Sequence, residues 1–257
     1  MVWGIEESKR ETAIANRVLA EVGLATGALA ALGHASMRVP SDPDKFVVKG
    51  RGYPIDALSR MRPDDMVVCD LDGNKLDGPA NIGQCFEVKI HSTIYKSHPE
   101  VNGVVHVHPR YTVMLSVQQA RIVPMCPEGV QMVRNPLPLY NHMRMISTEE
   151  EGMEVANTMA ASPGILLRGH GAVTAAASVD QAVMNMLGLE EQAKMNWYAR
   201  CAFGPDYQGI PDELVDDMID FLVNPTWLEL PHLKGNLSTN QVNGVWNHYS
   251  ELVSRDI

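Results

Sequence analysis

Two histidines stand two residues apart in a short apolar segment that reads Val104-Val105-His106-Val107-His108. On an extended strand, side chains at positions i and i+2 share one face, so the two imidazoles lie together. When neutral, they offer two nitrogen lone pairs to one metal ion. The alternative is a pair of partly buried histidines that hydrogen-bond to the backbone, and this alternative is favoured for the pair taken alone.

A third histidine, His170, stands between Gly169 and Gly171 directly after an apolar segment. Glycines let the chain turn sharply and bring this side chain close to a neighbour. The alternative is an exposed histidine at an ordinary corner between strands. Together with the first pair, His170 makes a site of three imidazoles the better interpretation. Three protein ligands leave coordination positions open, which is typical of a catalytic metal site.

A carboxylate is expected to accompany the histidines. Glu87 opens a predicted helix four residues before His91, and that helix leads into the strand of His106. A glutamate at the start of a helix often interacts only with the helix dipole. Burial among apolar side chains such as Phe86 raises the pKa of Glu87, whereas a neighbouring metal lowers it. The sequence leaves the net direction open.

The elements that must position these side chains follow from hydrophobic spacing. Residues 164–167, between a predicted helix and the His170 turn, are apolar and predict a strand. Alternating helices and strands imply a sheet flanked by helices, without fixing whether its strands are parallel. The predicted helices are 8–23, 87–97, 111–117, 147–160 (with Ser147 as N-cap and Glu150 completing a capping box), 179–203 and 212–223, and the predicted strands are 35–39, 46–48, 66–69, 104–107, 164–167 and 172–175.

Composition narrows the class of protein. The chain has 257 residues, of which 45% are hydrophobic and 20% are charged, as in a globular protein with a sizeable core. A net charge of −10 argues against nucleic acid as a partner. No signal peptide or membrane span is expected. Four widely spaced cysteines are interpreted as free thiols, which predicts a cytoplasmic protein.

Several motifs together resemble the class II aldolase/adducin family. Their order and spacing agree from about residue 10 to about residue 200, which is most of the chain. The motifs are Gly33-His34-Ala35-Ser36-x-Arg38, Glu87-x-x-x-His91, Tyr95, Pro99, Val104-Val105-His106-x-His108-Pro109 and Arg168-Gly169-His170-Gly171.

The resemblance implies a single α/β domain with a central, mainly antiparallel sheet between layers of helices. The predicted domain spans 1–205, and 206–257 form a helical C-terminal extension packed on the same domain or on a neighbouring subunit. The resemblance also implies a divalent metal held by His106, His108 and His170, with Glu87 as a further ligand or as acid/base. It implies a homotetramer with sites at subunit interfaces.

The sequence departs from the sugar-phosphate aldolases of that family. Cys85 and Phe86 precede Glu87 where those enzymes have small hydroxyl residues, and His34 replaces their asparagine. A phenyl ring offers no hydrogen-bond donor to a phosphate, so Phe86 suits a flat or apolar group. The chain also lacks a tyrosine between Tyr111 and Tyr140, the region that supplies the aldolase proton donor.

These departures resemble the branch that decarboxylates hydroxylated aromatic or heteroaromatic carboxylates. The predicted activity is therefore that of a carboxy-lyase with Glu87 as acid/base, acting on a small carboxylate. The alternatives are an aldolase acting on an unphosphorylated hydroxy-ketone or hydroxy-acid, and a non-catalytic scaffold like adducin. Zn²⁺ is preferred by ligand type, with Mn²⁺, Mg²⁺, Fe²⁺ and Co²⁺ as alternatives. The predicted substrate-binding residues are His34, Ser36, Arg38, Phe86 and Arg110.

Overall fold

The computed structural model describes residues 3–224, 230–231 and 244–257. Its strands are β1 (His34–Arg38), β2 (Lys45–Arg51), β3 (Met66–Asp70), β4 (Lys75–Asp77), β5 (Gly83–Gln84), β6 (Gly103–Val107), β7 (Leu139–Tyr140), β8 (Gly164–Leu167) and β9 (Gly171–Ala176). Its α-helices are α1 (Ile5–Glu21), α2 (Val88–Ser97), α3 (Arg110–Val117), α4 (Val130–Val133), α5 (Glu149–Met159), α6 (Val179–Phe203), α7 (Asp212–Val223) and α8 (Gly244–Val253).

Within the described residues the strands form one sheet. Their order is β4-β3-β2-β1-β6-β9-β8-β7, and β5 pairs separately with β2. Neighbouring strands run antiparallel except for β7 and β8, which are parallel. The predicted mainly antiparallel sheet is therefore confirmed.

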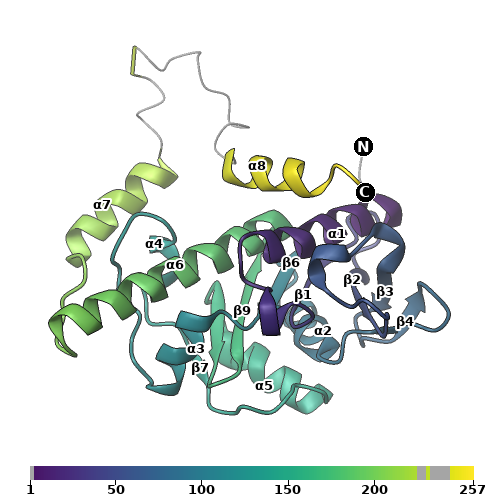
Figure 1. The fold of residues 1–257 in the computed structure, drawn as a ribbon, viewed down its shortest axis with the longest axis horizontal. Coiled ribbons are helices and arrows are strands. Elements are labelled where there is room, and N and C mark those ends of the chain that lie inside the picture. The colour runs from purple at the N-terminus through teal and green to yellow at the C-terminus, as the bar shows by residue number, and fades with distance from the viewer. Residues whose placement is uncertain (1–2, 225–229, 232–243) are drawn as a thin grey trace.

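Helices cover both faces of this sheet, with α1 and α6 on one face and α2 and α5 on the other (Figure 1). The central strand β6 shows why both faces are buried. Val105 and Val107 pack into the core beneath α1 and α6, whereas Val104 packs on the side of α2 and α5. This alternation follows from the two-residue period of a strand. The three-layer α/β arrangement confirms the predicted fold class.

Most predicted elements lie within a few residues of the observed ones, and α6 and α7 have the predicted bounds. The N-cap of α5 differs. Thr148, not Ser147, is extended and accepts a hydrogen bond from the amide of Glu151 at 3.2 Å. The Glu151 carboxylate accepts in return from the amide of Thr148 at 3.1 Å. The prediction of Ser147 with Glu150 as the capping box was wrong by one residue, because Ser147 instead donates to the Glu151 side chain.

The C-terminal helix α8 packs on α1 of the same chain. Trp246 and Val253 are buried against the core that α1 and α6 share. The buried guanidinium of Arg17 on α1 donates to the carbonyl of Val253 at 2.9 Å and pairs with Asp256. Residues 225–229 and 232–243 of the predicted extension lie outside the described residues, and the boundary at residue 205 stays a prediction. In the described part of the chain, no helix is long and apolar enough to cross a membrane.

Candidate metal centre

The candidate site lies at one end of the central strands β1, β6 and β9, where these strands begin or end. His34, at the start of β1, stands opposite His106 of β6. Val107, at the end of β6, stands opposite Ala172 near the start of β9. Because these strands are antiparallel neighbours, their ends meet. The sheet therefore brings His106 and His108 beside His170, which immediately precedes β9.

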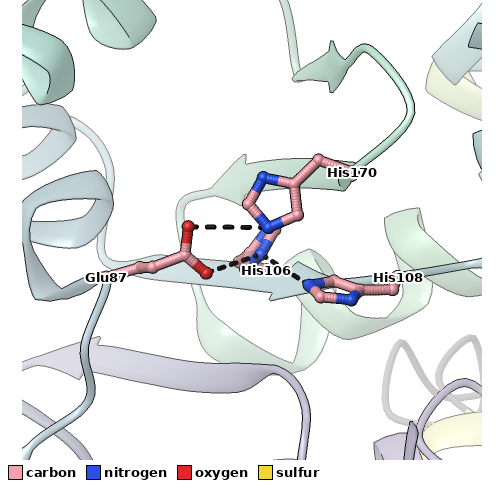
Figure 2. Close-up of side chains that lie close together, drawn as sticks. All are labelled: Glu87, His106, His108 and His170. Atoms are coloured by element: carbon pink, nitrogen blue, oxygen red, sulfur yellow. Dashed lines mark hydrogen bonds and ion pairs between the residues drawn. The ribbon is translucent and has the colours of Figure 1, made fainter. Parts of the chain in front are cut away.

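Glu87 and three histidines point toward one another at these strand ends (Figure 2). The carboxylate oxygens of Glu87 lie 3.3 Å from Nε2 of His106 and 3.6 Å from Nε2 of His170. Nε2 of His108 lies 3.2 Å from Nε2 of His106. One ligand atom from each residue lies within 4.8 Å of the others. The structure thus brings together all four residues proposed from sequence as metal ligands.

The hydrogen bonding of His106 shows that this group suits a cation. Its Nδ1 lies 3.0 Å from the carbonyl of Ala172, so in the neutral ring this nitrogen carries the hydrogen and donates. Nε2 then presents a lone pair to the carboxylate of Glu87, an unfavourable contact between two acceptors. A divalent cation between them would turn both groups into ligands, and a carbonyl that fixes the tautomer is typical of metal-binding histidines. Three nitrogens and one carboxylate form a donor set that fits Zn²⁺ or another divalent metal.

Electrostatics favour a charged Glu87 and a neutral His108. Burial alone would raise the pKa of Glu87, but positive charge at the position of His106 and His170 outweighs burial and holds this pKa below its usual value. The main-chain amide of Ile146 also donates to the Glu87 carboxylate at 3.0 Å. Burial, with the neighbouring His106 and His170, lowers the pKa of His108 to about 3. The direction that the sequence left open for Glu87 is therefore downward.

A buried chain of hydrogen bonds supports His34 from behind. Nδ1 of His34 lies 2.6 Å from Nε2 of His91, and Nδ1 of His91 lies 2.6 Å from the hydroxyl of Ser36. That hydroxyl lies 2.8 Å from the hydroxyl of Tyr95. Burial, followed by the effect of His106, lowers the pKa of His91 to about 3. Because Nδ1 of His34 is engaged here, its other ring nitrogen is left for the cavity that His34 lines.

Two predicted substrate-binding residues do not reach the site directly. Ser36 is completely buried behind His91. The guanidinium of Arg38 donates to the main-chain carbonyls of Val101 at 3.0 Å and Tyr95 at 2.8 Å. These bonds stabilise the connection between α2 and β6. The polar atoms of Ser36 and Arg38 are satisfied within the protein and neither residue lines the cavity described below, so their contact with a substrate stays a prediction.

The other three predicted substrate-binding residues surround the group of four. His34 and Phe86 line a cavity of about 160 Å³ together with Glu87. Arg110 is exposed and lines a neighbouring hollow with His108.

Sequence reasoning missed Lys49 and Arg51, which line the same cavity. The Gly50-Arg51-Gly52 segment lacks the Gly-Lys-Ser/Thr residues that would follow in a phosphate-binding loop, so the local sequence assigns it no function. The pairing of β1 with β2, which puts this segment beside His34, could not be read from local sequence.

The fold and this group of side chains define an α/β protein with a candidate metal centre at one end of the central strands of a mainly antiparallel sheet. The family model described as Class II Aldolase and Adducin N-terminal domain matches residues 10–197. The chain belongs to this family, as the sequence motifs predicted.

Relatives and solved structures agree with this assignment. The chain is 29% identical over 250 residues to a 3,4-dihydroxyphthalate decarboxylase from Arthrobacter keyseri, covering 94% of this chain and 92% of the relative. It is also 29% identical over 253 residues to an enzyme of the same name from Rhodococcus jostii (strain RHA1), covering 95% of each. An aldolase II superfamily protein from Pseudomonas syringae has a similar fold, with a TM-score of 0.77 at 20% identity over 97% of this chain and 93% of that chain. The family and these relatives bear out the prediction of a lyase.

The structure leaves no room for a side chain at Gly171. A Cβ there would lie 2.5 Å from the carbonyl oxygen of Val107 and 2.9 Å from Cε1 of His106. We expect Gly171→Ala to destabilise the protein by about 1–3 kcal/mol, as overpacking does, and to weaken Zn²⁺ binding by displacing His106. Urea unfolding and Zn²⁺ titration measure the two effects. Gly83→Ala is the matched control, because nothing lies within 4 Å of its added Cβ, and equal behaviour of the two variants would contradict the prediction.

Stability is expected to depend on pH through the buried histidines. His91 and His108 have pKa values of about 3 in the fold, against about 6.5 in an unfolded chain. As pH falls from 6.5 toward 3, the unfolded chain binds protons that the folded protein excludes, so the free energy of unfolding falls. Each histidine contributes a slope of at most about 1.4 kcal/mol per pH unit. Urea unfolding of chelator-treated protein between about pH 7 and 5 measures this slope, and an unchanged slope in His91→Gln would argue against the assigned role of His91.

Proposed function

We propose that this protein is a divalent-metal-dependent decarboxylase of a hydroxylated aromatic or heteroaromatic carboxylate. The observation that carries the proposal is the convergence of His106, His108, His170 and Glu87 beside a cavity that Phe86 lines. The dihydroxyphthalate decarboxylase names of the two relatives support the reaction and the substrate class. The donor set supports Zn²⁺ as the preferred metal, held by the three histidines and Glu87. We also propose a cytoplasmic homotetramer.

The cavity suits one planar ring. Its volume is about 160 Å³, and an apolar cavity of about 150 Å³ in another protein holds benzene. The Phe86 ring offers an apolar surface at one wall, while the histidines and Glu87 form a polar wall. A metal bound at the polar wall supplies Lewis acidity, which stabilises negative charge on chelating oxygens of the substrate.

Glu87 carries the proton in this proposal. Its lowered pKa keeps Glu87 ionised before the substrate binds. In this proposal the carboxylate gives up its place as a metal ligand when the substrate binds, and one of its oxygens then accepts the proton of the substrate hydroxyl. The bond between the ring and the carboxylate then breaks, CO₂ leaves, and the electron pair stays with the ring. Glu87 returns its proton to that ring carbon, and the phenolate oxygen takes one proton from solvent. His34, held by His91, lines the same cavity and is placed to orient the substrate through its free ring nitrogen.

A panel of dihydroxyphthalates and hydroxypyridine dicarboxylates tests this function. Zn²⁺-loaded protein is expected to release CO₂ from at least one member of the panel.

Because Glu87 moves the proton, Glu87→Gln should lower kcat by about 100- to 10,000-fold. His170→Ala should lower both bound Zn²⁺ and activity, and elemental analysis measures the metal. His142→Ala is the control, because His142 is exposed and lies outside the group.

Other outcomes would point to the alternative functions. Release of an aldehyde from an unphosphorylated hydroxy-ketone, without CO₂ from any acid, would favour an aldolase. Negligible metal after purification without chelator would favour a non-catalytic scaffold. Full activity in His170→Ala would contradict the proposed centre directly.

A further inference from the structure

The cavity beside the candidate metal centre has a second polar wall that carries positive charge. Lys49 and Arg51, at the end of β2, line it together with His34 and Phe86. The side chain of Lys49 is 1% exposed and that of Arg51 is 26% exposed, so Arg51 is the more accessible of the two cations. Glu87, His108 and His170 line the same cavity. A molecule within it would therefore meet both walls.

The charges of this second wall do not balance. Lys49 and Arg51 share one carboxylate, that of Asp56: Nζ of Lys49 contacts one oxygen, and Nε of Arg51 lies 3.2 Å from the other. Two cations and one carboxylate leave one positive charge. The remaining acid of the cavity lining, Glu87, lies in the other polar wall, among the histidines of the candidate metal centre. The unbalanced charge at Arg51 favours an anionic group in the cavity.

The guanidinium of Arg51 is fixed in orientation. Its Nε pairs with Asp56, and its Nη1 donates to the carbonyl of Ala31 at 2.7 Å. Its Cζ lies 4.9 Å from the centre of the Phe86 ring, within the range of a cation–π contact. Among the described residues, Nη2 of Arg51 has no hydrogen-bond acceptor. A guanidinium held in this way loses little conformational freedom when it binds a carboxylate.

We propose that Arg51 binds the second carboxylate of a dicarboxylate substrate, the one that is retained, and so selects dicarboxylates over monocarboxylates. This inference rests on the proposed function and names the substrate class of the same site. The reacting carboxylate then faces the wall of Glu87 and the histidines, and the ring packs beside Phe86. Arg51 is thus a specificity-determining residue. Asp56 and Phe86 hold its guanidinium in place.

The other arginines considered from the sequence fit this role less well. The donors of Arg38 are taken by main-chain carbonyls outside the cavity. Arg110 is exposed and lines a neighbouring hollow rather than this cavity. Arg51, by contrast, lines the cavity, has no acceptor for its Nη2 among the described residues, and shares the single carboxylate of Asp56 with Lys49.

Binding of phthalate and benzoate to the Zn²⁺-loaded protein, measured by calorimetry, tests the role of Arg51. Neither acid has the hydroxyl on which the proposed reaction depends, so neither is consumed. The ratio of their Kd values isolates the second carboxylate. In Arg51→Gln, the Kd of phthalate is expected to rise by about 10- to 100-fold, as for loss of charge-assisted hydrogen bonds, while that of benzoate changes little. Arg51→Lys should keep only part of the preference, because an ammonium keeps the positive charge but lacks the planar, fixed guanidinium donors.

Arg10→Gln is the control, because Arg10 lies on α1 outside the cavity and pairs with Glu11. Its Kd ratio should match that of the unmodified protein. An unchanged ratio in a folded, Zn²⁺-loaded Arg51→Gln would overturn the proposal. If that variant does not fold, an unchanged ratio in Arg51→Lys would do so. Absence of CO₂ release from every hydroxylated acid would refute the proposed function, whereas dependence of phthalate binding on Arg51 would still support the carboxylate subsite.

Discussion

The structure depends on the close approach of one carboxylate and three imidazoles at one end of the central strands. With the proton of His106 held on Nδ1 by the carbonyl of Ala172, its Nε2 faces the carboxylate of Glu87. Such a contact costs free energy unless a cation lies between the two groups. Hydrogen bonds behind the ligand atoms, from the amide of Ile146 to Glu87 and from His106 to Ala172, keep the group in place. The strong positional constraint at these strand ends is therefore electrostatic.

The fold satisfies this constraint with rigid elements. β6 supplies His106, the turn before β9 supplies His170, and Glu87 stands at the N-terminus of α2. Glu190 on α6 adds support from a distance, since its carboxylate accepts hydrogen bonds from the amides of Tyr111 and Thr112 at the start of α3. These bonds fix the chain just after His108, where Pro109 has no amide hydrogen to donate. Core packing on both sheet faces thus sets the positions of Glu87 and the histidines.

Much of this arrangement could be predicted from the sequence because its signals are local. The alternation around His106 predicted the strand and its two faces, and the spacing of apolar residues predicted α6 over its full length. The motifs around Glu87 and His170 resemble a family whose order of residues already implies that they meet. The short strands β4, β5 and β7 were missed because two or three residues carry no periodic pattern. The position of Arg51 beside the cavity could not be predicted, because strand pairing, not local sequence, decides which arginine faces the cavity.

The adjacency of Phe86 and Glu87 couples two properties that could otherwise vary independently. One peptide bond joins Phe86, which lines the apolar part of the cavity, to Glu87, which faces the three histidines. The Phe86 ring also contacts the guanidinium of Arg51. A backbone shift that enlarges the cavity at Phe86 would also move the Glu87 carboxylate away from His106. Exchanging the Phe86 side chain therefore changes the size of the cavity with less effect on the neighbouring carboxylate than a change in the backbone of this loop.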